Sequence, residues 1–204
     1  MVMMSDVSEL KDMLEKIEGK IIAAGKIYAA MYFAYWLVAM IGYYLILPFS
    51  QSHVLLLSVI YWPVAVLVSF FVGWKSSMRM KEIEKNKSSK LLGILIFVSW
   101  SIGAFVGWSV LPSMSMGIND EASLAMGFLS FIGISILGMW LSFELFKMKS
   151  REMIPSFIFA FAGVPVAMNI HAGAMLWAGY MVAMGFSITV LLYLYSAFRT
   201  LEEA

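Results

Sequence analysis

The chain has 204 residues, of which 62% are hydrophobic and only 13% are charged, and its formal net charge is +1. A soluble domain is about half apolar and about a quarter charged, so this composition excludes an ordinary soluble protein and predicts a chain embedded in lipid. Cysteine is absent, which excludes disulfides, thiolate metal ligands and a thiol nucleophile.

The first segment is polar and is predicted to form an amphipathic helix. Residues 5–20 alternate acidic and basic side chains, and Ser5 or Asp6 is placed to cap the helix. The apolar residues follow a heptad spacing of threes and fours: Val7, Leu10, Leu14, Ile17, Ile21, Ala24 and Tyr28. This spacing fits a helix lying on the membrane surface or on the inner face of the protein, and it also fits a seam for self-association.

Six apolar segments follow, and we expect each of them to cross the membrane. A helix of about 20 residues spans a hydrocarbon core of about 30 Å, and only the fifth segment is at the short limit. The segments cover residues 27–47, 53–74, 91–111, 122–146, 153–169 and 172–197. The sequence therefore predicts an all-α integral membrane protein: a cytoplasmic amphipathic helix at 1–26, a six-helix transmembrane domain at 27–199 and a short tail at 200–204.

The basic residues predict the orientation of this domain. All fourteen lie before the first segment, between the second and third, between the fourth and fifth, or after the sixth. Basic residues gather on the cytoplasmic side of membrane proteins, so we expect both termini in the cytoplasm and the chain in the cell membrane. The connection 75–90 has six basic and two acidic residues, a net charge of +4, which suits an anionic membrane surface or a cytosolic partner.

Two stretches of the sequence resemble each other. Residues 36–48 read WLVAMIGYYLILP and residues 100–112 read WSIGAFVGWSVLP, so each opens with Trp and closes with Leu-Pro. A hairpin repeated in parallel orientation is one interpretation. A second is an inverted repeat of three plus three spans, in which Pro63 and Pro165 correspond. The third is that these are ordinary helix ends, because Pro is common in membrane helices.

The segments offer little catalytic chemistry. Glu144 is the only acidic residue in a span, and we expect it near the inner headgroups, whereas proton pumps and ion-coupled carriers need ionisable groups at depth. His53 and His171 lie at outer ends without the spacing of metal ligands, and Asp120 and Glu121 are placed to cap the fourth span. No phosphate loop, nucleophile elbow or zinc motif is present. We therefore expect no catalytic residue, no metal, no cofactor and no nucleic-acid partner, and an enzyme acting on lipid is the least favoured function.

The two prolines inside spans predict a binding site. Proline cannot donate a backbone hydrogen bond, and in lipid the freed carbonyl must find another partner or line a wet cavity. We expect the helix breaks at Pro63 and Pro165 to face the interior and to frame a pocket for a neutral ligand. Ser58, Tyr61 and Trp62 lie near Pro63 and would supply hydrogen bonds and an aromatic wall.

Small residues at helical spacing predict close helix packing, because they let helix backbones approach each other in lipid. They form three stripes in the third, fourth and sixth spans: Gly103, Gly107, Gly127, Ser130, Gly133, Gly179, Ala183 and Ser187.

These features favour two functions. The first is a permease-like or channel-like protein that moves or binds a neutral or apolar solute without proton coupling. The alternative is a non-catalytic membrane subunit that assembles with itself or with a partner complex through its N-terminal helix and cytoplasmic loops. In both cases the lipid bilayer is the surrounding medium.

Overall fold

The computed structural model describes residues 2–46, 54–81, 88–114, 118–148, 150–170 and 172–203. Pro48, His53 and His171, which the sequence singled out, lie outside the described residues. In chain order the elements are α1 (Val2–Ile46), α2 (Val54–Lys81), α3 (Ser88–Phe105), the π-helical turn η2 (Val106–Val110), α4 (Leu111–Met114), α5 (Asp120–Leu145), the 3-10 turn η3 (Arg151–Met153), α6 (Ile154–Ala167) and α7 (Ala174–Glu202). The described part of the chain is almost entirely helical and contains no strand.

Five of the helices are long and apolar enough to cross a membrane. They are α1, α2, α3 with its continuation to Met114, α5 and α7. α6 has 14 residues, about 21 Å at the usual helical rise, which is shorter than a hydrocarbon core of about 30 Å. The all-helical architecture is therefore observed and is consistent with an all-α membrane protein, and a sixth span remains a prediction.

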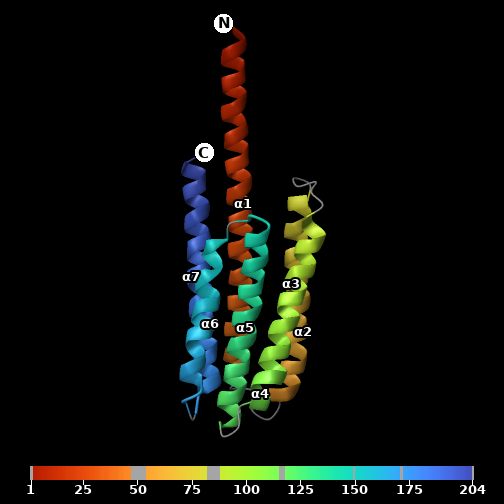
Figure 1. Cartoon of the computed structure of the whole chain (residues 1–204), viewed down its shortest axis with the longest axis vertical. Helices are drawn as coiled ribbons and strands as arrows, with labels where there is room; N and C mark the ends of the chain where they lie inside the picture. The colour runs from red at the N-terminus through yellow and green to blue at the C-terminus, as the bar shows by residue number, and fades with distance from the viewer. Residues whose placement is uncertain are drawn as a thin grey trace.

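The long helices run side by side in alternating directions (Figure 1). Both termini lie at the same end of the bundle, together with the ends of α2 and α5 and the starts of α3 and α6 (Figure 1). The basic residues of the described chain gather at this end, as the charge pattern predicted. That this end faces the cytoplasm remains a prediction, and we refer to it below as the inner end.

The polar N-terminal segment and the first span form one helix. α1 is continuous over 45 residues, about 68 Å, which is more than twice the thickness of a hydrocarbon core. It does not turn at the expected boundary near residue 26 and does not fold onto the inner face of the protein. Instead its N-terminal part projects beyond the other helices (Figure 1).

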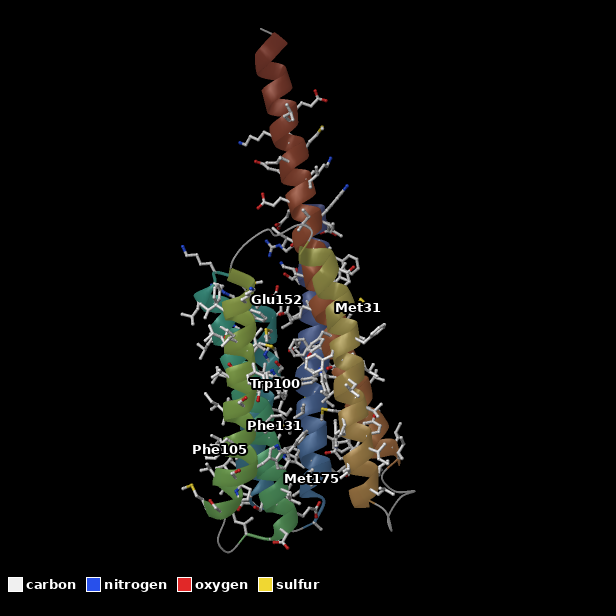
Figure 2. All side chains as sticks on the ribbon, turned by 90° about the vertical axis from the view of Figure 1, so that its right-hand side faces the viewer. Met31, Trp100, Phe105, Phe131, Glu152 and Met175 are labelled. Atoms are coloured by element: carbon white, nitrogen blue, oxygen red, sulfur yellow. The ribbon has the colours of Figure 1, made fainter. Side chains whose placement is uncertain are left out.

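The helices pack in the spatial order α2, α1, α7, then α5 with α6, and finally α3. Within the described ranges, α2 contacts only α1 among the helices, and α2 and α3 do not touch each other. Figure 2 shows these two helices standing apart, α2 in gold and α3 in yellow-green. The core lies among α1, α5, α6 and α7, and Leu129, Ile136 and Val182 are among its fully buried side chains.

Candidate functional site

The predicted ligand residues of α2 lie against α1. The Tyr61 hydroxyl donates a hydrogen bond to the Ala39 carbonyl oxygen at 2.5 Å, and the hydroxyls of Ser58 and Tyr43 are 2.7 Å apart. The Trp62 ring packs on the Tyr43 ring with centroids 4.9 Å apart. These polar atoms are therefore engaged in holding α2 on α1. Their arrangement is that of a helix–helix contact.

The two prolines inside helices, Pro63 of α2 and Pro165 of α6, lie on exposed sides of those helices. Both helices continue through the proline, and Pro63 and Pro165 are exposed. The neighbours of Pro63 on α2 include Ile60 and Val64, which are also exposed. The inward orientation expected from the sequence is wrong, because the face of α2 that turns inward carries Ser58 and Trp62 instead.

Glycines of α3, of the π-helical turn η2 and of α5 bring these elements into backbone contact. A Cβ atom on Gly107 would lie 2.5 Å from the Gly127 carbonyl oxygen, and one on Gly127 would meet the Gly107 carbonyl in return. Gly103 faces α5 in the same way, while Gly133 faces α6, where its Cβ would lie 2.8 Å from the Phe161 ring. A side chain at Gly103, Gly107 or Gly127 would meet the backbone of the facing helix and push the two apart.

The remaining small residues are placed less uniformly. Gly179 of α7 faces the Tyr44 ring of α1, and Ser130 of α5 is buried. Ala183 and Ser187 are half-buried, and the Ser187 hydroxyl donates to the Ala183 carbonyl oxygen of its own helix at 2.8 Å.

Sequence reasoning missed further contact glycines, and Gly163 and Gly185 are two of them. A Cβ on Gly163 of α6 would meet Leu129 and Met181 at 3.1 Å, and one on Gly185 of α7 would lie 3.0 Å from the Ser156 backbone. Gly163 and Gly185 fall outside the small-residue stripes, so no spacing in the sequence indicated them.

A polar cluster joins three elements at the inner end. The Lys26 ammonium of α1 lies 3.7 Å from the Glu152 carboxylate of η3 and donates to Ser196 Oγ at 2.6 Å and Thr200 Oγ1 at 3.2 Å on α7. The two charged side chains are only 23% and 14% exposed. No feature of the sequence indicated this cluster, because its members lie far apart in the chain and Lys26 was interpreted as one of many cytoplasmic basic residues.

A second cluster lies at the end of the bundle opposite to the inner end, where it joins the start of α5 to the start of α7. The Glu121 carboxylate accepts hydrogen bonds from the backbone N–H groups of Gly173 and Met175, each at 3.2 Å. Glu121 therefore caps α7, whereas the sequence placed it as a cap of its own helix. That helix, α5, is capped by Asn119, whose side chain accepts a bond from the Ala122 N–H at 2.7 Å.

The projecting part of α1 carries apolar side chains that are exposed outside the bundle. Leu10, Leu14 and Ile17 are 63%, 67% and 57% exposed. They lie on one face of the helix, which we call the seam. On the other side, Gly19 faces the end of α7 across an open groove of about 490 Å³ that Thr200 also lines. Above this level, α1 has no packing partner within the described chain.

The polar face of this projection is acidic. The groove at the end of α7 is lined by five carboxylates and one ammonium group: Glu9, Asp12, Glu15, Glu18, Glu203 and Lys16. Among the described residues no group of three acidic or histidine side chains is arranged to hold a metal ion.

Comparisons of the chain with protein families, with curated proteins and with solved structures found no match.

Proposed function

We propose that this chain is a non-catalytic membrane subunit that assembles with another protein, or with a second copy of itself, through the projecting seam of α1. The observation that carries the proposal is the exposure of Leu10, Leu14 and Ile17 on a helix that extends past the ends of its neighbours. Apolar side chains of the membrane spans face lipid, but a seam outside the bilayer faces water unless a partner covers it.

The energetics favour a partner. A helical segment of this length is marginal in water on its own and is normally stabilised by packing of its apolar face. Complete burial of a Leu or Ile side chain contributes about 1.5–3 kcal/mol, so covering the three partly exposed residues would contribute about 3–6 kcal/mol before the cost of association. This magnitude suits a contact that is modest alone and gains strength from other contacts in a membrane assembly.

The charge of the projection argues against a helix that lies on the membrane. Helices at the membrane surface carry Lys and Arg on their polar face, which anionic lipids attract. Residues 5–18 contain five acidic and two basic residues, a net charge of −3. An anionic inner leaflet would repel this segment, which supports a helix that stands away from the surface.

Transport is supported less well by the geometry. The Ser58 hydroxyl is hydrogen-bonded to the Tyr43 hydroxyl of α1, and the Tyr61 hydroxyl donates to the α1 backbone. Both prolines face outward. A solute pathway would need polar groups turned toward a continuous opening, and these residues are turned toward another helix.

The test is a double substitution in the seam, Leu14→Asp with Ile17→Asp, in the full chain expressed in its native cells. Lys16→Asp is the matched control, because it changes the net charge by the same two units on the other side of the helix. After extraction in mild detergent, we expect the unaltered chain and the control to run as a larger assembly and the double variant to run at a lower mass. An unaltered chain that runs as a monomer, or a double variant with unchanged mass, would contradict the proposal.

A further inference from the structure

The structure also indicates what kind of partner covers the seam. Resting on the proposed function, we infer that the seam binds an amphipathic helix of a cytosolic protein, and that it does not pair with α1 of a second copy. The inference depends on where the seam leads when it is followed into the bundle.

The same face of α1 is occupied by α2 inside the bundle. Eighteen residues make five full turns of a helix, so Tyr35 lies on the same side of α1 as Ile17, and Gly42 lies close to that side. The Tyr35 hydroxyl donates to the Ala65 carbonyl oxygen of α2 at 2.6 Å. A Cβ on Gly42 would lie 2.8 Å from the Tyr61 hydroxyl of α2. The seam is therefore the continuation of the α1–α2 contact beyond the end of α2.

This continuity excludes a parallel pair of α1 helices. Paired helices run about 8–10 Å apart, and a heptad seam keeps the same face turned to the partner along its length. α1 is unbroken from Val2 to Ile46, so a second α1 that paired along the seam would run into α2 at Tyr35 and Gly42. Two copies in one membrane also have the same orientation, which excludes the antiparallel pair.

Within the described ranges, no helix covers the seam beyond the ends of its neighbours. The contacts of Tyr35 with Ala65 and of Tyr43 with Ser58 set an antiparallel register that places the end of α2, at Lys81, about level with Gly19. α7 ends near the same level, since Thr200 lines the groove with Gly19. Among the described residues nothing lies over the seam above the end of α2, so a helix that arrives from the cytoplasm has room to pack there.

The rim of the seam specifies the chemistry of the partner. Lys11 and Glu18 flank the seam on one side, and Met13 and Lys20 flank it on the other, all of them exposed. Charges of both signs at these flanking positions pair with opposite charges on the facing helix. The partner helix therefore carries a stripe of Leu or Ile over about two heptads, with acidic and basic residues mixed along its edges.

The absence of cysteine allows a direct test of the excluded partner. A single Leu14→Cys in the full chain, reconstituted in liposomes and oxidised with copper phenanthroline, should give no disulfide-linked dimer.

The positive probe is a synthetic helical peptide with Leu at the core positions of three heptads and alternating Glu and Lys at the flanks. We expect it to bind the chain in nanodiscs, with Leu14→Asp plus Ile17→Asp weakening binding by about tenfold or more and Lys16→Asp leaving it unchanged.

Each outcome has a distinct meaning. A high yield of Leu14→Cys dimer would show that a second copy covers the seam, which overturns this inference and leaves the proposed assembly function standing. A peptide that does not bind, or that binds the double variant equally well, also overturns the inference. The proposed function itself is contradicted only by the two outcomes of the detergent experiment described above, a monomeric unaltered chain or a double variant of unchanged mass.

Discussion

Replacing Lys26 by Met should destabilise the inner end of the bundle more than replacing an exposed lysine. The substitution keeps much of the apolar stem but removes the ammonium group. That group donates to Ser196 at 2.6 Å and to Thr200 at 3.2 Å, and it faces the Glu152 carboxylate at 3.7 Å. Figure 2 shows Glu152 toward the inner end, beside the helices that the cluster joins.

The magnitude follows from burial and distance. A hydrogen bond to a charged group contributes about 1.5–3 kcal/mol, and breaking a fully buried ion pair costs about 3–5 kcal/mol. Here the side chains of Lys26 and Glu152 remain 23% and 14% exposed, and their charged atoms are not in hydrogen-bond contact. We therefore expect Lys26→Met to lower the free energy of unfolding by about 2–4 kcal/mol.

The assay is unfolding of the purified chain in mixed micelles by titration with sodium dodecyl sulfate, followed by circular dichroism. Lys20→Met, on the exposed part of the same helix, is the control and should change the free energy by less than about 0.5 kcal/mol. The double variant Lys26→Met with Glu152→Leu should recover part of the loss, because it leaves no unpaired buried charge. A single variant as stable as the control, or a double variant that shows only the sum of the two single losses, would refute the reasoning.

Two further predictions concern the packing and the orientation of the bundle. Gly127→Ala should lower the free energy of unfolding by about 1–3 kcal/mol, because the added Cβ meets the Gly107 backbone. The control is Gly93→Ala in α3, where an added Cβ meets nothing, and it should be neutral or slightly stabilising. Equal effects of the two substitutions would contradict the contact. A single Ala172→Cys should react with an impermeant thiol reagent applied to intact cells, and a single Glu18→Cys should react only after the membrane is opened; the reverse pattern would invert the assigned topology.

The sequence by itself determined the environment of this chain and the kind of element it forms. Apolar segments long enough to cross lipid leave a helix as the only way to satisfy their backbone, and this follows from composition and length alone. The heptad pattern at residues 7–28 likewise identified the apolar face of the N-terminal helix, because periodicity is a local property. The gathering of basic residues at one end of the bundle followed from the order of the segments.

Tertiary structure alone decided how those elements are used. Whether Pro63 faced a pocket or lipid depended on which side of α2 met α1, and hydrogen bonds from Tyr61 and Tyr43 decided that. Lys26 and Glu152 meet only because α1 and η3 are brought together by α7. No described residue covers the seam, because the helices α2 and α7 end below it. These outcomes depend on contacts between residues far apart in the chain, and no local pattern in a single sequence carries that information.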